Sequence, residues 1–282
     1  MIPPLITSRR NPLVKRLKRL GTREGRVQEG LLILEGTHLL QEVLTHRSAV
    51  VELIATPAWV DRHGELFGQL PDPLPIHLVS QDVLAASLST VTPDGVACLV
   101  PLAALPKPPS SCDFLLVLDR IQDPGNLGTL LRTALAADVQ SVWLGSGADP
   151  LASKVLRASA GALLQLHHRR FGPEERSAVV QLEAKMKEMA VAGMQVVASL
   201  VPDADRQLQA IPYWELDWTK PTALVLGTEG AGLHPTLQHC CTTAVTLPHS
   251  SRIESLNVAA AAVPLLLERR RATMTATSQQ SG

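Results

Sequence analysis

Three polar stretches of this 282-residue sequence carry side chains that could act on a substrate. The first spans residues 126–132, the second is "LGTEGAGL" at residues 226–233, and the third is "SLNVAAAA" at residues 255–262. Their polar side chains of interest are Asn126, Arg132, Glu229, Ser255 and Asn257. An arginine can hold a phosphate or stabilise a developing negative charge, and amide or hydroxyl groups can orient a ligand. Because a guanidinium stays protonated in proteins, Arg132 is a poor general base by itself.

Each of these stretches follows a short apolar run that is typical of a strand buried on both faces. The runs are "FLLVLD" (114–119), "ALVLG" (223–227) and "AVTLP" (244–248). Three similar runs lie at residues 141–145, 163–166 and 195–200. Helical segments separate the runs, so we predict an α/β fold with a parallel sheet that has helices on both sides. Each polar stretch would then lie in a loop that follows a strand.

Local signals place two of the asparagines near helix starts. Asn126 stands where a helix N-cap is expected after a turn, which puts Arg132 nearly two turns into that helix. In the third stretch a helix begins at residue 254 or 255, so Asn257 falls in its first turn, among free backbone N–H groups. From these patterns alone, Arg132 could equally lie on a solvated helix face, and Ser255 could be a simple N-cap.

The glycines of the second stretch follow a strand but do not form a dinucleotide fingerprint. Gly227, Gly230 and Gly232 have the spacing G-x-x-G-x-G, whereas the fingerprint is G-x-G-x-x-G. Elsewhere, "GSG" at residues 145–147 has Pro150 where the third glycine would stand. Glycines after a strand still let the backbone approach a ligand closely. The sequence therefore argues against a nucleotide-dependent oxidoreductase.

A proline-rich stretch at residues 101–111 predicts a linker between two domains. Residues 1–100 alternate between strands and helices and predict a small α/β domain. Residues 112–271 hold the parallel sheet, and residues 272–282 are small and polar, which predicts a disordered tail. In the first domain we expect helices at about 11–20, 36–45, 57–68 and from 80, and strands at 31–34, 50–55, 76–79 and 96–100.

Charge and composition limit the partners. Residues 1–30 hold eight basic and two acidic side chains in a chain of zero net charge, which is typical of a surface for a phosphate-rich partner or of a solvated helix face. The four cysteines lack C-x-x-C spacing and the nine histidines are scattered, so we expect reduced thiols and no metal site. Because no apolar run is long enough for a signal peptide or a membrane span, we expect a cytoplasmic protein without a membrane partner.

Taken together and in this order, the three stretches resemble the motifs of the SpoU/TrmH-type RNA 2′-O-ribose methyltransferases of the SPOUT superfamily. Asn126 and Arg132 match the first motif, "LGTEGAGL" with Glu229 matches the second, and "LP" followed by "SLNVAAA" matches the third. Residues 148–163 look like the family's stretch between the first two motifs. The first hundred residues are similar to a substrate-binding domain that is often fused ahead of the catalytic one and that resembles ribosomal RNA-binding proteins.

This resemblance implies a deep trefoil knot in the second domain, a homodimer, and S-adenosyl-L-methionine (SAM) as the methyl donor. The cofactor-binding positions that it implies are Gly227, Thr228, Gly230, Leu247, Pro248, Ser255, Leu256 and Asn257. The catalytic candidates are Arg132, Asn126 and Glu229, of which we expect Arg132 to stabilise the ribose alkoxide or to clamp the neighbouring phosphate. The RNA-binding candidates are Arg9, Arg10, Lys15, Arg16, Lys18, Arg19, Arg132, Lys154 and Arg157.

Two residues of the third motif depart from the family pattern. His249 and Ser251 stand where a methionine and a glycine are common, and a β-carbon at residue 251 would restrict the loop if it needed a positive φ. The affinity for the cofactor is the property that this departure puts in question. The likeness of the first domain to ribosomal RNA-binding modules favours ribosomal over transfer RNA as substrate. The alternative from another class is a non-catalytic RNA-binding protein with the same fold, which would fail to bind SAM.

Overall fold

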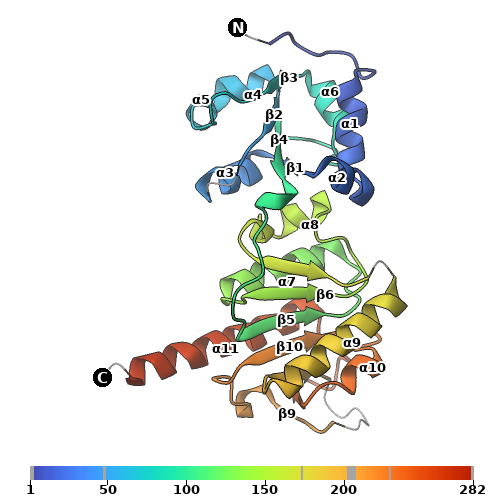
Figure 1. The fold of residues 1–282 in the computed structure, drawn as a ribbon, viewed down its shortest axis with the longest axis vertical. Coiled ribbons are helices and arrows are strands. Elements are labelled where there is room, and N and C mark those ends of the chain that lie inside the picture. Colours follow the sequence, from blue (N-terminus) through green and yellow to red (C-terminus); the bar gives the residue numbers. More distant parts are fainter. Residues whose placement is uncertain (1–2, 47–48, 173, 202–207, 229, 281–282) are drawn as a thin grey trace. The chain divides into compact units, whose positions relative to one another are not determined.

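The structure is a computed structural model that describes residues 3–46, 49–172, 174–201, 208–228 and 230–280. The chain forms two compact units (Figure 1). The first unit comprises Met1–Pro106 and Asp149–Gln165, and the second comprises Lys107–Ala148 and Leu166–Gly282. The division at residue 106 falls in the proline-rich stretch. Residues 149–165, however, fold with the first unit, whereas the sequence placed them inside the second domain.

The first unit is built on a four-stranded sheet in the order β1-β4-β2-β3. Only the β2–β3 pair is parallel among these neighbours. The strands are β1 (Leu31–Glu35), β2 (Glu52–Ala55), β3 (Ile76–Leu78) and β4 (Val96–Pro101). The helices are α1 (Pro12–Leu20), α2 (Arg23–Glu29), α3 (Thr37–Thr45), α4 (Pro57–Arg62), α5 (Gly64–Phe67), α6 (Gln81–Ser87) and α8 (Ser153–Ala158). Between β4 and the second unit lies a 3-10 turn, η1 (Leu102–Ala104).

Helix α1 packs on this sheet because its leucines and valine fall on one face. Leu13, Val14, Leu17 and Leu20 are buried in one cluster with side chains of the sheet and of α6. This spacing, i, i+1, i+4 and i+7, is that of an amphipathic helix, and Lys15, Lys18 and Arg19 between these positions are exposed. The basic segment is therefore part of the folded core of the first unit.

The second unit holds a seven-stranded sheet in the order β7-β6-β5-β10-β8-β11-β9, in which every paired neighbour is parallel. The strands are β5 (Phe114–Leu118), β6 (Ser141–Leu144), β7 (His167–Arg170), β8 (Gln195–Ser199), β9 (Ala210–Pro212), β10 (Thr222–Leu226) and β11 (Thr243–Thr246). The helices are α7 (Pro124–Ala136), α9 (Glu175–Val191), α10 (Pro235–Gln238) and α11 (Val258–Gln280), with 3-10 turns η2 (Ala162–Leu164) in the first unit and η3 (Tyr213–Glu215) here.

The two central strands of this sheet are buried along their whole length. All five residues of β5 and of β10 are buried, although successive side chains point to opposite faces. On one face, alternate residues of these strands cluster with Val179, Leu182 and Met186 of α9. Helices α7 and α11 pack against each other. The predicted parallel sheet covered on both faces is confirmed.

Three local predictions differ from the structure. The apolar run 163–166 is not a strand, because residues 162–164 form the turn η2 and the strand begins at His167. The tail from residue 272 was predicted to be disordered, whereas α11 continues to Gln280. The helix predicted at 57–68 is divided into α4 and α5 at His63.

A buried carboxylate attaches residues 149–165 to the sheet of the first unit. Glu35, at the end of β1, is 5% exposed and accepts hydrogen bonds from the Ser153 hydroxyl (2.6 Å) and from Nη1 of Arg157 (2.9 Å). Ser89 and Thr90 donate to the same carboxylate. Burial opposes the charge, but the hydrogen bonds from Ser153, Thr90 and Ser89 outweigh it and lower the pKa of Glu35.

Candidate active site

The first motif lies where β5 gives way to α7. The helix begins at Pro124, and the carboxylate of Asp123 accepts the backbone N–H of Asn126 (2.8 Å). The N-cap is therefore Asp123, and the prediction of Asn126 as the cap is wrong by three residues. Proline is favoured at the first helical position because it needs no N–H partner there, which fixes the cap at the residue before it.

Arg132 projects from the exposed side of α7. Arg132 is exposed, whereas Leu130 and Leu131, which precede it, are buried in the core. Within the part of the chain that the structure describes, its guanidinium makes no hydrogen bond or ion pair. Its five N–H donors are thus available to a group from outside this set of residues.

The third motif begins α11 and contacts the first. The helix starts at Val258, and Oδ1 of Asn257 accepts the backbone N–H groups of Ala259 (3.0 Å) and Ala260 (3.1 Å). Asn257 is therefore the N-cap, one position before the first turn in which it was predicted. Its Nδ2 donates to Oδ1 of Asn126 at 3.0 Å. This hydrogen bond joins two motifs that are 131 residues apart.

The second motif is a tight loop that closes on itself after β10. Thr228 and Gly232 exchange two backbone hydrogen bonds, of 3.1 and 3.0 Å. A β-carbon on Gly227 would lie 2.3 Å from the carbonyl carbon and oxygen of Gly232, and Gly232 itself has a φ of +63°. Both glycines are thus required by the backbone. Glu229, a catalytic candidate, lies outside the described residues.

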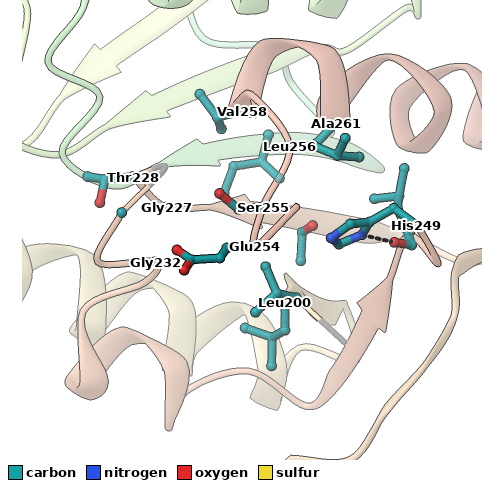
Figure 2. A pocket seen from close by; sticks show the side chains of 15 residues that line it. Leu200, Gly227, Thr228, Gly232, His249, Glu254, Ser255, Leu256, Val258 and Ala261 are labelled. Atoms are coloured by element: carbon teal, nitrogen blue, oxygen red, sulfur yellow. Dashed lines mark hydrogen bonds between the residues drawn. The ribbon is translucent and has the colours of Figure 1, made fainter. Parts of the chain in front are cut away.

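The loops of the second and third motifs, together with residues 199–201, surround a cavity of about 320 Å³ (Figure 2). Of the predicted cofactor-binding residues, the structure brings six to its wall: Gly227, Thr228, Gly230, Leu247, Ser255 and Leu256. Pro248 and Asn257 do not line it but adjoin lining residues in the chain. The other lining residues are Ser199, Leu200, Val201, Leu226, Gly232, His249, Glu254, Val258 and Ala261.

The sequence reasoning missed the contribution of β8 to this cavity. Ser199 ends β8, and Leu200 and Val201 follow it, so the strand delivers three residues to the wall. The signal was present, because the run at 195–200 was recognised as a strand and ligands of parallel sheets bind beyond the carboxyl ends of strands. What the sequence did not reveal is that β8 lies between β10 and β11.

The two departures in the third motif have different outcomes. His249 lines the cavity, and its Nδ1 donates to the carbonyl oxygen of Leu247 at 2.9 Å. Ser251 is not among the described non-glycine residues with positive φ, which are Arg120, Asp138 and Ala160. The loop therefore does not need a glycine at residue 251. Figure 2 shows the Glu254 carboxylate between the loop at Gly232 and Leu200.

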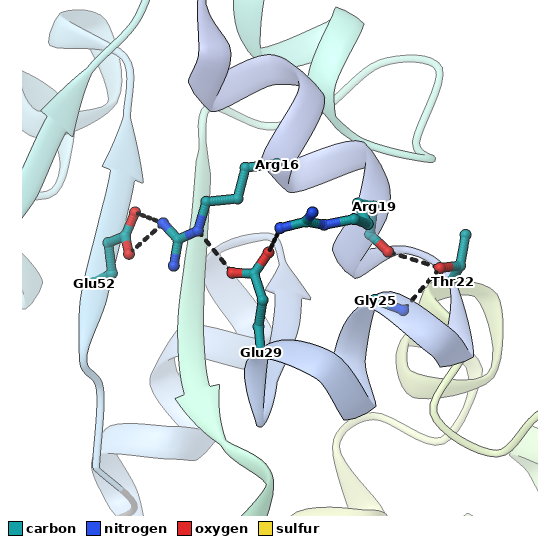
Figure 3. A network of polar contacts seen from close by, with 6 residues as sticks. All are labelled: Arg16, Arg19, Thr22, Gly25, Glu29 and Glu52. Atoms are coloured by element: carbon teal, nitrogen blue, oxygen red, sulfur yellow. Dashed lines mark hydrogen bonds and ion pairs between the residues drawn. The ribbon is translucent and has the colours of Figure 1, made fainter.

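Part of the predicted basic surface is used in ion pairs within the first unit (Figure 3). Nη1 of Arg16 donates to both oxygens of Glu52 and its Nε donates to Glu29, all at 2.7 Å, and Arg19 donates to Glu29 at 2.6 Å. Burial opposes ionisation of Glu52, but hydrogen bonds from His77 and Arg16 lower its pKa overall.

The remaining RNA-binding candidates fall into two groups. Arg157 is paired with buried Glu35 at 2.9 Å, and its side chain is 35% exposed. The others are exposed at the surface of the first unit: Arg9, Arg10, Lys15, Lys18 and Lys154.

Other features of the described residues bear on chemistry. No three histidine, cysteine or acidic side chains among them gather as a metal site. Burial raises the pKa of the Cys98 and Cys241 thiols to about 12, so neither is a reactive thiolate at neutral pH. A search of the same residues finds no helix with the length and apolarity to cross a membrane.

Two domain families match the two parts of the chain. Residues 113–266 match the SpoU rRNA Methylase family, and residues 11–98 match the MRM3-like substrate binding domain. The first match spans more than half of the 282 residues, which is enough to assign the chain to that family.

Full-length relatives agree with this match. The chain is 39% identical to an uncharacterized tRNA/rRNA methyltransferase of Synechocystis, over 94% of this chain and 93% of that protein. It is 31% identical to the 23S rRNA (guanosine(2553)-2′-O)-methyltransferase RlmP of Bacillus subtilis, over 94% and 98% of the two chains. A crystal structure of an RNA 2′-O ribose methyltransferase, 26% identical, superposes with a TM-score of 0.76 over 96% of this chain and 100% of that one. The AdoMet-bound rRNA methyltransferase from Sinorhizobium meliloti, also 26% identical, gives 0.75 over 95% and 97%. The chain therefore belongs to the SpoU rRNA methylase family.

Proposed function

We propose that this protein transfers a methyl group from SAM to a ribose 2′-hydroxyl of RNA. The observation that carries the proposal is the convergence of the three motifs. The second and third line one cavity of about 320 Å³, and the first is hydrogen-bonded to the third through Asn126 and Asn257. The named relatives that methylate ribose in RNA support the same activity.

The cavity fits SAM in size and in chemistry. Its volume lies at the lower end of the range for small-molecule sites, about 300–1,000 Å³. Apolar side chains such as Leu200, Leu247 and Leu256 can pack on an adenosine, and the Glu254 carboxylate offers a negative charge to a cationic ligand. The AdoMet-bound relative supports this assignment. When bound, SAM supplies a methyl group on a positively charged sulfonium.

The residues of the chain must orient the ribose and stabilise the charge that develops on its 2′-oxygen. In the transfer, that oxygen would take the methyl group, its proton would go to solvent water, and S-adenosylhomocysteine would leave. Arg132 is the candidate for stabilising the oxygen or for holding the adjacent phosphate, because its guanidinium is exposed and pairs with none of the described residues. Asn126 and Asn257 are joined by a hydrogen bond that holds the first motif against the third.

The first unit is the proposed RNA-binding part, and ribosomal RNA is the proposed substrate. Exposed Lys15 and Lys18 on α1, with Arg9 and Arg10 before it and Lys154 on α8, supply positive charge. Arg16 and Arg157 contribute less in this proposal, because both already neutralise buried carboxylates. The matched substrate-binding domain and the 23S rRNA-specific relative favour ribosomal over transfer RNA.

The test is methyl transfer from isotopically labelled SAM to purified ribosomal RNA and, separately, to transfer RNA. We expect label in ribosomal RNA, at a position where the adjacent phosphodiester resists alkaline hydrolysis, because that cleavage needs a free 2′-hydroxyl. Label in transfer RNA alone would correct the substrate. Label that leaves the phosphodiester alkali-sensitive would show base methylation. If calorimetry detects RNA binding but no SAM binding, the protein is a non-catalytic RNA-binding protein.

We infer in addition that two copies associate through α11 and that the second unit is knotted, as the family resemblance implies. Val263, Leu267 and Met274 are 38%, 42% and 60% exposed, and their spacing puts them on one side of the helix. Sedimentation of the purified protein tests the dimer. Leu267→Glu should dissociate it, whereas Val191→Glu, at an apolar site on α9 that is 90% exposed, should not. A wild-type protein that sediments as a monomer at micromolar concentration would exclude this dimer.

A further inference from the structure

Two residues that directly follow β5, Asp119 and Arg120, form hydrogen bonds to the glycine loop, residues 227–234. Asp119 is 1% exposed, and its Oδ2 accepts the backbone N–H of His234 at 2.8 Å and Nε of Arg120 at 3.1 Å. A buried carboxylate must be satisfied by donors of this kind. Asp119 therefore fixes the carboxyl end of the loop to the sheet.

Arg120 fixes a second point of the loop. Its Nη2 donates to the carbonyl oxygen of Gly232 at 3.3 Å, and its Nη1 donates to Glu175, at the start of α9, at 3.2 Å. The same Gly232 oxygen accepts the N–H of Thr228, which closes the loop. One guanidinium thus connects a strand end, a helix start and the loop that lines the cavity.

The backbone of Arg120 adopts a conformation that disfavours a side chain. Its φ is +55°, in the left-handed region that glycine enters freely and that side chains with a β-carbon rarely adopt. Such strain persists where surrounding contacts over-determine the conformation, and it is found at functional sites. A glycine would serve the turn better, so the contacts of the guanidinium are what arginine adds.

We propose that Arg120, acting with Asp119, is a positioning residue that holds the glycine loop in the shape that binds SAM. This inference rests on the proposed function for the identity of the ligand. Arg120 does not line the cavity, so it acts through Gly232 and His234 and touches no reacting atom. Its effect should therefore appear in cofactor affinity far more than in the rate of methyl transfer.

The decisive variant is Arg120→Gly, which removes the guanidinium and relieves the backbone strain together. We expect the variant to stay folded, with a cooperative thermal transition, a KM for SAM raised at least fivefold, and a kcat within twofold. Hydrogen exchange of the His234 and Gly232 amides should become at least fivefold faster without any cofactor. Arg120→Lys, which keeps the positive charge on a shorter side chain, should restore the KM and the amide exchange part of the way to the wild-type values.

Ala160→Gly is the matched control, because Ala160 also has a positive φ, +50°, but no polar side chain. It should raise the melting temperature and leave both the KM and the loop exchange unchanged. Wild-type KM and wild-type exchange in Arg120→Gly would overturn the positioning role. If the wild type bound no SAM while the exchange still rose in Arg120→Gly, the clamp on the loop would stand and the proposed function would fall.

Discussion

Replacing Gly227 by alanine tests whether backbone packing inside the glycine loop sets the cofactor site. The new methyl group would lie 2.3 Å from the carbonyl carbon and oxygen of Gly232 and 2.5 Å from the nitrogen of Leu233. These are backbone atoms, and ordinary contact begins more than an ångström farther out. The loop must therefore open, at the expense of the two Thr228–Gly232 hydrogen bonds.

The size of the effect follows from these contacts. Overpacking costs about 1–3 kcal/mol, and each lost hydrogen bond about 1 kcal/mol. We expect a net penalty of about 3–5 kcal/mol for reaching the binding-competent loop, which corresponds to a Kd for SAM at least about 100-fold higher. Because the site is a surface loop beyond the strand ends, the far-ultraviolet circular dichroism of the variant should match that of the wild type.

Two neighbouring glycines provide the controls. A β-carbon on Gly230 would meet nothing within 4 Å among the described residues, so Gly230→Ala should leave the loop closed and raise the Kd much less than Gly227→Ala, through the one methyl group that it adds to the cavity wall. A β-carbon on Gly232 also has room, but its φ of +63° costs alanine about 1–2 kcal/mol, so Gly232→Ala should fall between the two. Calorimetric titration with SAM gives all three constants. Equal constants for Gly227→Ala and Gly230→Ala would refute the packing argument.

Three further predictions concern the arginine of the first motif, the basic surface and the buried carboxylate. Arg132→Ala should lower kcat about 100-fold or more with an unchanged Kd for SAM, because Arg132 does not line the cavity. Nearly full activity in Arg132→Lys would show that the planar guanidinium is not needed and would exclude a bidentate clamp on the phosphate. Lys15→Glu with Lys18→Glu should weaken RNA binding and flatten its dependence on salt, as measured by filter binding. Arg16→Ala should mainly lower the melting temperature, because it removes the guanidinium that pairs with Glu52 and leaves His77 as its remaining cationic partner. Equal loss of RNA affinity in both variants would contradict this division. Glu35→Gln should destabilise the protein by about 2 kcal/mol at pH 7. Because the folded pKa of Glu35 lies below its ordinary value of 4.5, the difference in unfolding free energy between wild type and variant should persist above pH 4.5 and vanish as the pH falls through the folded pKa. A difference that stays the same between pH 7 and pH 3 would refute this account.

The sequence predicted the central part of the fold because burial on both faces leaves a continuous apolar run. This is why β5 and β10 were recognised. The edge strands carry no such signal, since β7 is "HHRR" and mostly outside the core, and β9 has three residues. Helix α2, "REGRVQE", is polar on most sides and was missed for the same reason. Elements that pack on one side only need tertiary information to be found.

The candidate site was predicted from the family motifs more accurately than from local helix signals. Six of the eight cofactor-binding candidates line the cavity, and these positions came from the resemblance of the three stretches to the family's motifs. The helix N-caps were misplaced. The proline at residue 124 makes Asp123 the cap of α7, and Asn257, not Ser255, caps α11. The contacts of Asp119 with His234 and of Glu35 with Ser153 join residues 115 and 118 positions apart, and no local pattern records them.

The attachment of residues 149–165 to the first unit has a consequence for the order of folding during synthesis. The other part of that unit ends at Pro106, yet Glu35 receives its Ser153 and Arg157 partners only after the ribosome has made β5, α7 and β6. At about 5–20 residues per second, this delay lasts roughly 2.5–10 s. During that interval Glu35, at the end of β1, has its Ser89 and Thr90 donors but lacks those of Ser153 and Arg157. The first unit is therefore completed only after synthesis of the second has begun, and a fragment that stops at the proline-rich linker reproduces the nascent chain and not the finished unit.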